Sequence, residues 1–464
     1  MAQFYLAAAH KSSGKTTVAI GLCAALKSRG HSVQAFKKGP DYIDPMWLER
    51  ATGRVCWNLD FHTASREFNQ SRFQRHAADA DISVVEGNMG LFDGLSLDGS
   101  DSNAAMAKLL GLPVVLVLDC AGTSGGVAPL LTGYRQFDPG IQYAGVILNK
   151  LAGQRHESKI RALVERYTDF NIVGAIHRGA DIRMTERHLG LVPSNEISAQ
   201  AGQIIDHLSK VVAQSVDLDY LSGLEVSPME GTSVVPEVTT NKSNQRLRVA
   251  IARDDAFGFY YPDDLARFAQ LGVELVEFDA SSTTSLPQAV DGLFVGGGFP
   301  ESRLAELSAN FSLRDDIRQK VVAGLPTYAE CGGLMYLCRS MSMNDREYPL
   351  CGVIPARVRF SPRPQGRGYA ILRSNPGHPW YPDDDATTRQ INAHEFHYSW
   401  LDEIDQDQRF GYTVERGTGI DGINDGIIIS NMVASYVHQR QTDQCTWVDD
   451  FVGFIKRNKS KRQP

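Results

Sequence analysis

The feature that most constrains this chain is a loop near its N-terminus, AHKSSGKTT at residues 9–17. It lies between a predicted strand and a predicted helix, and it matches the Walker A pattern, with Ala9 where glycine is commoner. In such a loop, successive backbone N–H groups and the start of the helix surround the phosphates of a nucleotide. Lys15 adds a positive charge, and the Thr16 hydroxyl is suited to binding Mg²⁺. We therefore expect ATP to bind here, through Lys11, Ser12, Ser13, Gly14, Lys15, Thr16 and Thr17.

Strand-like and helix-like segments alternate through the first part of the chain. The apolar runs lack an alternation of polar and apolar residues, which is typical of strands buried on both faces of a parallel sheet. The predicted strands are 4–6, 33–36, 82–86, 114–119 and 144–149, and a helix is predicted at 15–29. This order predicts a doubly wound α/β domain, which we assign to residues 1–224.

A change of composition separates this domain from the rest of the chain. Residues 225–246 are rich in Ser, Thr, Pro and Asn, and we interpret them as a linker. The alternation of strands and helices then resumes, which predicts a second α/β domain at residues 247–464. Its predicted strands are 247–252, 273–278, 292–295 and 326–330.

Polar side chains end two predicted strands of the first domain, at the edge of an open α/β sheet where ligands bind. Glu86 ends the strand at 82–86, as a Walker B carboxylate does, and is a candidate Mg²⁺ ligand together with Thr16. Asn149 ends the strand at 144–149 and is a candidate for recognising the base of the nucleotide. The alternative interpretation of Glu86 is an ordinary acidic residue in the turn after a strand. The alternative interpretation of Lys11 is a solvated lysine of the loop that does not contact phosphate.

The segment KKGPDYIDP at 37–45 follows the second predicted strand and carries two lysines and two carboxylates. This is more charge than a simple connection needs. Near the γ-phosphate of ATP, Lys37 or Lys38 can stabilise the charge that moves during phosphoryl transfer. Asp41 can bind the metal or orient a substrate there. The alternative interpretation is a solvated turn held by its two prolines.

Cys331 lies between a predicted strand and a helical stretch at 334–337, and two glycines follow it. This arrangement is typical of a nucleophile elbow, where small neighbours permit a sharp turn and the start of the helix favours the thiolate. Upstream, the glycines of GGGFPE at 296–301 let backbone N–H groups approach a substrate oxygen. We therefore expect Cys331 to be a nucleophile. The expected oxyanion residues are Gly297, Gly298, Glu301 and Gly332.

A cysteine nucleophile needs a base, and the second domain offers four candidates: His378, His394, His397 and His438. His394 and His397 form an HxxH pattern, which is weak support for a metal site without further ligands. His438 ends the segment ASYVH at 434–438, which follows a further predicted strand, and could reach the elbow. Spacing along the sequence leaves the choice among the four open.

The composition of the chain argues against nucleic acids and membranes as binding partners. The net charge of −7 is opposite to the basic excess of a dedicated nucleic-acid binder, and no apolar run approaches the roughly 20 residues of a membrane helix. The seven cysteines contain no CxxC pair, which argues against a zinc site or a disulfide framework, and all but Cys331 are interpreted as core residues. We expect a cytoplasmic protein that acts on small molecules without nucleic-acid or membrane partners. A homodimer is a possible assembly.

Seven motifs, in order across both domains, resemble those of the cobyrinic acid a,c-diamide synthase family. They are FKKGPDYIDP (36–45), VVEGNMGLFDG (84–94), ERHLGLVP (186–193), GGGFPE (296–301), AECGGLMYL (329–337), HEFHYS (394–399) and ASYVH (434–438). The resemblance implies a dethiobiotin-synthetase-like P-loop domain followed by a flavodoxin-like class I glutamine amidotransferase domain. It also implies that Cys331 attacks glutamine and that His438 increases its nucleophilicity. The residues implied at the substrate and metal end of the ATP site are Asp41, Tyr42, Ile43, Asp44, Glu86 and Asp93.

The reaction implied by the resemblance is the ATP- and glutamine-dependent amidation of the a and c acetate carboxylates of cobyrinate. It passes through an acyl phosphate, requires Mg²⁺, and takes ammonia from glutamine bound at the oxyanion residues. The alternative from another class is a regulatory P-loop ATPase of the partitioning type, whose second domain binds a partner without catalysis.

Two features depart from the family pattern. Class I amidotransferases usually read H-x-E at the base, whereas Gln439 and Arg440 follow His438, so the identity of a third triad member stays open. The segment at 93–103 is longer and more acidic than expected and is similar to siblings that amidate sirohaem or sirohydrochlorin. A sirohaem-type amidase is therefore the alternative within the family.

Overall fold

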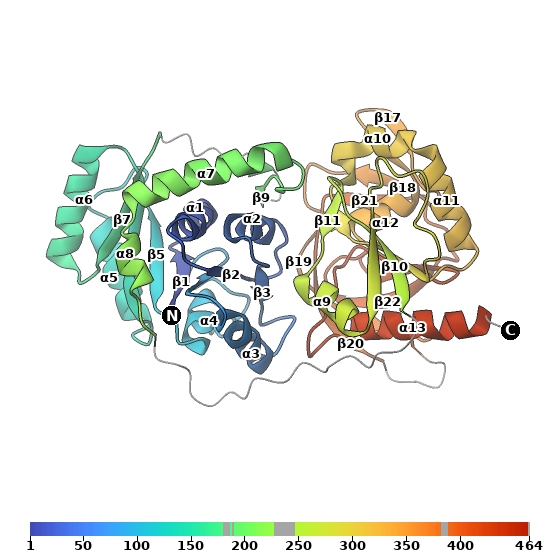
Figure 1. Cartoon of the computed structure of the whole chain (residues 1–464), viewed down its shortest axis with the longest axis horizontal. Helices are drawn as coiled ribbons and strands as arrows, with labels where there is room; N and C mark the ends of the chain where they lie inside the picture. The colour runs from blue at the N-terminus through green and yellow to red at the C-terminus, as the bar shows by residue number, and fades with distance from the viewer. Residues whose placement is uncertain (180–185, 188–189, 227–245, 382–387, 463–464) are drawn as a thin grey trace. The chain divides into compact units, whose positions relative to one another are not determined.

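The computed structural model describes residues 1–179, 186–187, 190–226, 246–381 and 388–462. The chain divides into two compact units, Met1–Pro236 and Glu237–Pro464, coloured blue to green and yellow to red in Figure 1. The predicted linker at 225–246 spans this division, and its residues 227–245 lie outside the described residues. Each unit has its own sheet.

The first unit is built on seven parallel strands in the order β3-β2-β4-β1-β5-β6-β7. The strands are β1 (Ala2–Ala8), β2 (Val33–Lys38), β3 (Trp57–Leu59), β4 (Ile82–Glu86), β5 (Val114–Asp119), β6 (Tyr143–Leu151) and β7 (Ile172–His177). The five predicted strands are all confirmed, and β3 and β7 widen the sheet at its edges. The loop at 9–17 leaves the carboxyl end of β1, which lies between β4 and β5 in the middle of the sheet.

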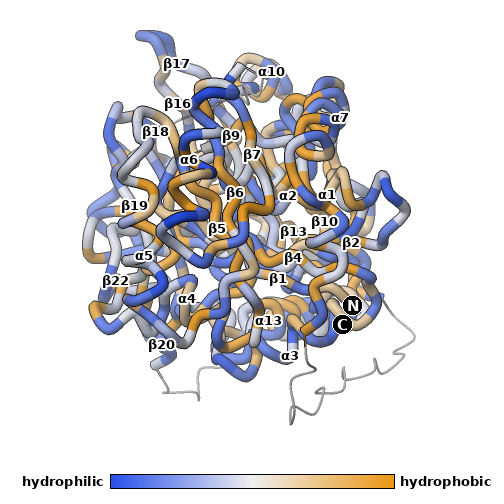
Figure 2. Tube along the Cα trace, turned by 90° about the vertical axis from the view of Figure 1, so that its left-hand side faces the viewer, coloured by the Kyte–Doolittle hydropathy of each residue, from blue (hydrophilic) through white to orange (hydrophobic). Residues whose placement is uncertain are grey.

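Helices cover both faces of this sheet. Figure 1 shows α1, α2 and α7 on one side and α3 and α4 on the other. The strands between them are hydrophobic along much of their length, as Figure 2 shows for β5 and β6, because neither face meets water. The helices of this unit are α1 (Lys15–Ser28), α2 (Ile43–Thr52), α3 (Arg66–Ala77), α4 (Asn103–Leu109), α5 (Val127–Phe137), α6 (Gln154–Tyr167), α7 (Ser198–Ser215) and α8 (Leu218–Ser222). Two short strands, β8 (Glu186–Arg187) and β9 (Gly190–Leu191), pair with each other outside the main sheet.

The second unit contains a nine-stranded sheet in the order β12-β10-β13-β15-β24-β23-β22-β19-β20. Its first five strands are parallel and follow the order 2-1-3-4-5, which confirms the flavodoxin-like architecture. They are β12 (Val273–Phe278), β10 (Leu247–Ala252), β13 (Gly292–Val295), β15 (Thr327–Glu330) and β24 (Met432–Ser435). These strands place the elbow at the carboxyl end of the parallel part.

Four antiparallel strands extend this sheet beyond the predicted α/β alternation. They are β23 (Asn424–Ile429), β22 (Arg409–Arg416), β19 (Gly366–Ser374) and β20 (Gln390–His397). Exposed residues recur along β19, as is usual for an antiparallel strand with one solvated face. The helices are α9 (Pro262–Gln270), α10 (Leu304–Ala309), α11 (Phe311–Val322), α12 (Gly332–Leu337), α13 (Trp447–Arg462) and the 3₁₀ turn η1 (Pro300–Arg303). Smaller sheets contain β17 (Arg346–Pro349), β16 (Cys338–Met343), β18 (Ile354–Phe360) and β21 (Ser399–Asp402), and β11 (Phe257–Phe259) with β14 (Gly297–Gly298).

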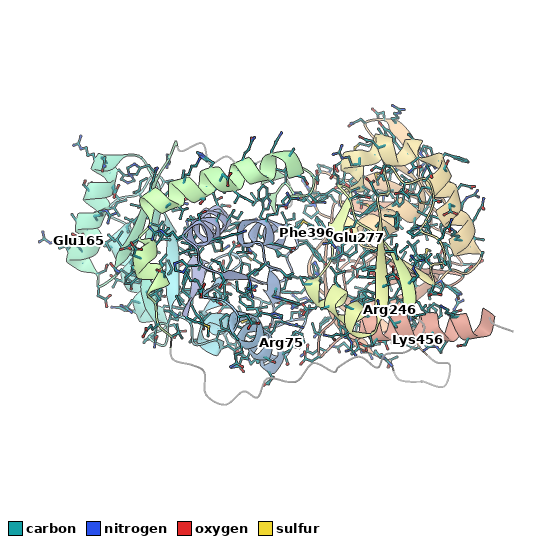
Figure 3. The ribbon with its side chains drawn as sticks, in the orientation of Figure 1. Arg75, Glu165, Arg246, Glu277, Phe396 and Lys456 are labelled. Carbon is teal, nitrogen blue, oxygen red and sulfur yellow. The ribbon has the colours of Figure 1, made fainter. Side chains whose placement is uncertain are left out.

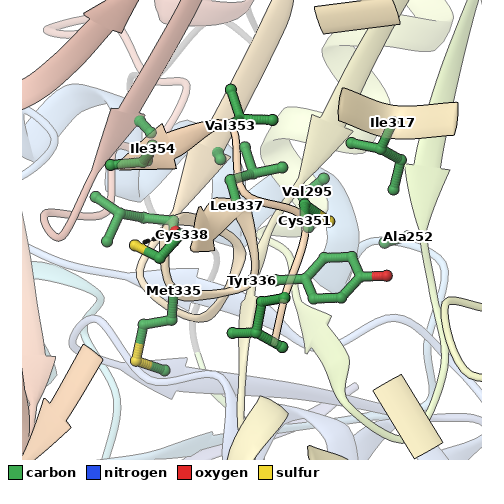
Figure 4. Close-up of a cluster of buried hydrophobic side chains, with 14 of the residues drawn as sticks. Ala252, Val295, Ile317, Met335, Tyr336, Leu337, Cys338, Cys351, Val353 and Ile354 are labelled. Atoms are coloured by element: carbon green, nitrogen blue, oxygen red, sulfur yellow. Dashed lines mark hydrogen bonds between the residues drawn. The ribbon is translucent and has the colours of Figure 1, made fainter. Parts of the chain in front are cut away.

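Neighbouring residues of the parallel strands enter two separate cores. In β10, Ala252 belongs to one core and Ile251 to the other, and in β13 Val295 and Phe294 divide in the same way. This follows from the two-residue period of a strand when both faces are covered. Figure 4 shows the first core, where the apolar side chains of α12 pack with Val295 and with α11. The short helix behind the elbow is thereby anchored.

Charged side chains such as those of Glu165 on α6 and Lys456 on α13 are exposed and point away from the ribbon (Figure 3). Among the described residues, no helix combines the length and the apolar composition that crossing a membrane requires.

Gly21 allows α1 to approach α7 closely. A Cβ atom at this position would lie 2.6 Å from Val212 Cγ2 and 2.8 Å from the carbonyl oxygen of Leu208. We expect Gly21→Ala to destabilise the protein by about 1–3 kcal/mol, because the backbone of α7 must shift. This cost outweighs the roughly 1 kcal/mol that alanine gains over glycine in a helix. Calorimetry of the full chain should record a lower Tm.

Gly202, also on α7, is the matched control, because nothing lies within 4 Å of a Cβ atom built there. Gly202→Ala should raise the Tm through helix propensity alone. Equal stability of the two variants would contradict the close packing of α1 on α7.

Candidate active sites

The loop at 9–17 is held in shape by contacts from β6. Ser12 and Gly14 have positive φ angles of 64° and 84°, and a Cβ atom at Gly14 would lie 2.4 Å from Asn149 Nδ2. Asn149 donates through Nδ2 to the Ser13 carbonyl at 2.8 Å, and Lys150 donates through Nζ to the Ser12 carbonyl at 2.6 Å. The predicted residue Asn149 therefore lies beside the loop, where it supports the phosphate-binding backbone. The sequence motifs did not single out Lys150, whose signal is its position at a strand end.

The side chains of the other loop residues face different surroundings. Lys11 and Ser12 are exposed, and Thr17 is half-buried at the start of α1. Ser13 is buried and donates through Oγ to the His10 carbonyl at 2.7 Å. The loop thus closes on itself through Ser13, and the phosphate-contacting role of Lys11 stays a prediction.

Glu86 brings the cations of this site together around one buried carboxylate. Strand register places it opposite Leu6 on β1 and Lys37 on β2. Its Oε1 lies 3.1 Å from Nζ of both Lys15 and Lys37. Oε1 also accepts a hydrogen bond from the Thr16 hydroxyl at 2.6 Å. Burial and the nearby Lys37 lower the pKa of Lys15 below its ordinary value, although Glu86 opposes this.

Lys37 belongs to this site and Lys38 does not, because adjacent residues of a strand point to opposite faces. Lys37 forms an ion pair with Asp44 and lies 3.7 Å from the carboxylate of Asp41. Burial alone would lower the pKa of Lys37, but the three surrounding carboxylates hold it well above its ordinary value. Lys38 instead donates to the Asp101 carbonyl at 2.7 Å. Of the two predicted lysines, Lys37 is therefore the one that lies beside Glu86.

The remaining residues predicted at this end of the site divide between it and its surroundings. Asp41 accepts hydrogen bonds from the N–H groups of Ile43 (2.9 Å) and Asp44 (3.1 Å), so it caps the start of α2. Tyr42 and Ile43 are buried next to it. Asp93 is exposed and accepts a hydrogen bond from a backbone N–H of its own turn. Asp93 therefore lies in a surface turn rather than in the buried cluster.

The oxygen atoms around Glu86 fit a Mg²⁺ ion that binds together with a nucleotide. Glu86 Oε2 is buried and has no hydrogen-bond partner. The Thr16 hydroxyl bridges Glu86 and Asp44, at 2.6 and 3.1 Å from one oxygen of each. Mg²⁺ prefers oxygen ligands and usually takes one or two carboxylates in addition to phosphate oxygens. In the part of the chain that is described, no three His, Cys, Asp or Glu side chains form a metal site by themselves.

The turn after β15 holds Cys331 in a strained backbone conformation. Its φ is 46° and its ψ is −100°, a combination that residues other than glycine rarely adopt. Its N–H donates to the Ser435 carbonyl at 2.7 Å, which ties the turn to β24. A Cβ atom at Gly333 would lie 2.1 Å from the Val295 carbonyl oxygen, so glycine is required two residues after Cys331. These are the features of a nucleophile elbow.

Two glycine-containing segments meet beside this elbow. A Cβ atom at Gly332 would lie 2.8 Å from the carbonyl oxygen of Gly298, and one at Gly297 would lie 2.5 Å from His438 Cε1. The first N–H groups of α12, which begins at Gly332, have no partner within the helix. Backbone N–H groups are thus gathered where an oxyanion site needs them. Glu301 follows in η1 and is half-buried.

His438 is the histidine that the structure brings to Cys331. It follows β24 and is buried, and its Nδ1 lies 3.4 Å from Glu330 Oε2. Burial alone would lower the pKa of His438, but its interactions with the neighbouring Cys331 and Glu330 raise it to about 10. An imidazolium beside the sulfur favours the thiolate, which is the nucleophilic form of cysteine.

The other three candidate histidines have different surroundings, and only His394 contacts His438 directly. The ring of His394 stacks on that of His438, with centroids 5.0 Å apart, and the two residues exchange backbone hydrogen bonds. His397 stacks on Tyr436, with centroids 4.0 Å apart. His378 lies among aromatic rings, and burial lowers its pKa to about 3, so it is neutral. The HxxH histidines therefore support β20 and the segment that carries His438.

Glu330 is the residue of this site that the sequence motifs left without a role. It is the last residue of β15, directly before Cys331, and it is buried. Its Oε1 accepts hydrogen bonds from the Tyr328 hydroxyl at 2.6 Å and from the Gln439 N–H at 2.9 Å. The signal for it in the sequence is an acidic residue in an otherwise apolar strand next to the nucleophile.

We expect Cys331 to be the first cysteine that iodoacetamide modifies in the folded protein, because it faces the His438 imidazolium. Burial raises the pKa of each of the other six thiols, to about 12 in Cys120, Cys351 and Cys445. Mass spectrometry of peptides after substoichiometric labelling measures the order. His438→Ala should slow the labelling of Cys331 alone, and prior labelling of a core cysteine would contradict the assignment.

Comparison with known proteins matches both units. Residues 5–192 match the CobQ/CobB/MinD/ParA nucleotide binding domain, and residues 248–443 match the CobB/CobQ-like glutamine amidotransferase domain. The cobyrinate a,c-diamide synthase of Magnetococcus marinus is 42% identical over 100% of this chain and 99% of its own length. Proteins of the same name from Synechocystis sp. and Listeria innocua are 36% and 38% identical, over 96% and 94% of this chain and 92% and 96% of their own lengths. The chain therefore belongs to the cobyrinate a,c-diamide synthase family.

Proposed function

We propose that this protein catalyses the ATP- and glutamine-dependent amidation of the a and c acetate carboxylates of cobyrinate, giving cobyrinate a,c-diamide. The observation that carries the proposal is that one chain contains both a P-loop built around Lys15 and Glu86 and an elbow that pairs Cys331 with His438. The shared name of the relatives supports cobyrinate as the substrate. Each carboxylate consumes one glutamine, one ATP and one water, and yields an amide, glutamate, ADP and phosphate.

Glutamine hydrolysis begins at Cys331. With its proton on His438, the sulfur attacks the amide carbon of glutamine and forms a tetrahedral oxyanion, which the backbone N–H groups around Gly298 and Gly332 stabilise. The C–N bond then breaks as His438 gives its proton to the leaving nitrogen. Ammonia leaves, and the γ-glutamyl thioester remains on the sulfur. Water hydrolyses the thioester to glutamate and restores the thiol.

The carboxylate is activated at the P-loop. A carboxylate oxygen of the tetrapyrrole attacks the γ-phosphorus of ATP, which forms an acyl phosphate and releases ADP. Oxide is a very poor leaving group, whereas phosphate leaves readily when ammonia attacks the acyl carbon. Lys15 and Lys37 offset the charge of the phosphoryl group during its transfer. The ion pairs of Lys37 hold it in the site before substrates arrive.

We infer that Thr16, Asp44 and Glu86 hold Mg²⁺ together with the nucleotide, with Asp41 as a further candidate ligand. When bound, the ion neutralises negative charge on the phosphate oxygens. Tyr42, Ile43 and Asp93 are proposed to contact the tetrapyrrole, and Asn149 the nucleotide.

The protein is further proposed to act in the cytoplasm, where thiols stay reduced. All seven cysteines are free, and the nucleophile requires a free thiol. A homodimer is the assembly that we propose to test, by analytical ultracentrifugation of the full chain.

The acidic segment at 93–103 does not favour the sirohaem alternative once its contacts are known. Asp101 accepts hydrogen bonds from the N–H groups of Leu95 (2.8 Å) and Ser96 (3.1 Å), and Asp98 accepts one from the N–H of Ser100 (2.9 Å). These carboxylates shape their own turns. The partitioning-type ATPase has no use for a strained cysteine turn beside a histidine, so the elbow argues against that class.

With cobyrinic acid and sirohaem offered together, we expect amidated products of cobyrinic acid alone, each amide lowering the mass by about 1 Da as OH becomes NH₂. Mass spectrometry of the products distinguishes the two substrates directly. Amidation of sirohaem in preference to cobyrinic acid would contradict the substrate that we propose.

Cys331→Ala should abolish amidation supported by glutamine, because no other group forms the thioester. Amidation supported by a high concentration of ammonium salt should be retained, since the P-loop unit is unchanged. Product formation with each nitrogen source measures the separation. If both activities disappear while the Tm is unchanged, Cys331 has a different role.

Lys37→Met tests the P-loop unit instead of the elbow. The substitution removes the ammonium group and keeps an unbranched side chain of similar length. We expect amidation to be lost with either nitrogen source, whereas glutamine hydrolysis by the elbow is not directly affected. Full ammonia-supported amidation in this variant would contradict the role of Lys37 in phosphoryl transfer.

A further inference from the structure

The carboxylate of Glu330 is directed at the catalytic histidine from the strand that carries the nucleophile. Glu330 ends β15, and Cys331 follows at the elbow. Glu330 Oε2 lies 3.4 Å from His438 Nδ1, and both side chains are nearly inaccessible to solvent. The pair therefore interacts in a dry environment, where charges are weakly screened.

The other oxygen of this carboxylate is fixed by two donors. The Tyr328 hydroxyl and the Gln439 N–H both donate to Oε1, at 2.6 and 2.9 Å. The Gln439 side chain in turn donates to the hydroxyls of Tyr328 (3.2 Å) and Tyr412 (2.9 Å). With Oε1 held in this way, rotation of the carboxylate away from His438 would break both hydrogen bonds.

We propose that Glu330 is the positioning residue of His438 and takes the part of the glutamate that an H-x-E sequence places two residues after the histidine. Here that place is occupied by Arg440, whose guanidinium is buried in an ion pair with Asp263 at 2.8 Å. The position after the histidine is Gln439, which braces Glu330 instead of facing the imidazole. The inference rests on the proposed glutamine hydrolysis and adds a residue to it.

A carboxylate at Nδ1 selects the state of the imidazole that catalysis needs. It keeps the proton of the neutral ring on Nδ1, which leaves Nε2 to exchange a proton with the thiol and the leaving nitrogen. It also stabilises the imidazolium that forms when the sulfur is deprotonated. The interactions with Cys331 and Glu330 raise the pKa of His438 against the effect of burial, in agreement with this geometry.

A purely structural role for Glu330 is the competing explanation, because the residue also accepts the Gln439 N–H. Glu330→Gln separates the two explanations. Glutamine keeps an oxygen that can accept the hydrogen bonds of Tyr328 and Gln439, but it has no charge to offer Nδ1. The titratable groups that face His438 are Glu330 from β15, Cys331 from the elbow and His394 from β20, so the variant changes one of three.

In Glu330→Gln we expect kcat for glutamine hydrolysis to fall by about 10- to 100-fold or more, the usual range for losing the partner that orients a functional histidine. KM for glutamine should change little, because Glu330 does not contact the substrate in this mechanism. The rate of Cys331 alkylation should fall as well, and its dependence on pH should shift. Glu330→Asp should recover part of kcat. Glu277→Gln is the matched control. Glu277 is an exposed glutamate on β12, labelled in Figure 3, and forms an ion pair with Arg253, so its substitution should leave all these values at those of the unmodified protein.

Unchanged kcat and alkylation in Glu330→Gln would overturn the proposal. If that variant does not fold, ¹⁵N NMR of the unmodified protein labelled at histidine decides the question. We expect the Nδ1 of His438 to stay protonated through neutral pH, and an unprotonated Nδ1 would overturn the proposal. If the unmodified protein does not hydrolyse glutamine, the proposed function fails, and the alkylation and NMR results still test the pairing of Glu330 with His438.

Discussion

The elbow depends on the close approach of three pieces of backbone: the turn at Cys331, the end of β13 and the strand β14. The contacts at Gly333 and Gly332 leave no space for a side chain, and Cys331 carries the strain of a positive φ. Such strain costs on the order of 1–3 kcal/mol and persists only where the surroundings determine it. Here the Cys331 N–H bond to β24 and the buried apolar side chains of α12 stabilise the turn. The strain places a sulfur at the end of a parallel sheet, next to backbone N–H groups.

In the first unit, the site at the carboxyl edge of the sheet depends on balancing the charges of buried lysines and carboxylates. Lys15 and Lys37 are buried close to each other, and they would repel strongly without Glu86 between them. Strand register supplies this arrangement, because Glu86 and Lys37 are paired neighbours in β4 and β2. A bound nucleotide would bring negative phosphate groups next to these two lysines. The site is therefore arranged before substrates bind, at the cost of burying several charges.

Buried carboxylates also shape the surroundings of the elbow, mainly by accepting backbone N–H groups. Asp425 accepts those of Tyr436 (3.0 Å) and Val437 (3.1 Å), which fixes the segment leading to His438. Burial raises the pKa of Asp425 to about 6, even though these hydrogen bonds lower it. Glu395, between the two histidines of the HxxH pattern, accepts two N–H groups from the β22–β23 connection, at 2.6 and 2.9 Å. Rigid positioning of this kind keeps a catalytic histidine in one orientation.

The local chemistry of the sequence determined the fold class and led to the predictions of a phosphate loop and a cysteine nucleophile, because each needs particular residue types at short spacing. A glycine before Lys15 and glycines after Cys331 are requirements of single turns, and the strands around them have a recognisable pattern. Only the tertiary structure decided among residues far apart in the chain. It brought His438 next to Cys331 and Glu330, and Lys37 rather than Lys38 next to Glu86, and it revealed the antiparallel extension. These outcomes depend on which strands are neighbours and in what register, and that is set by packing of the whole sheet rather than by any short stretch of residues.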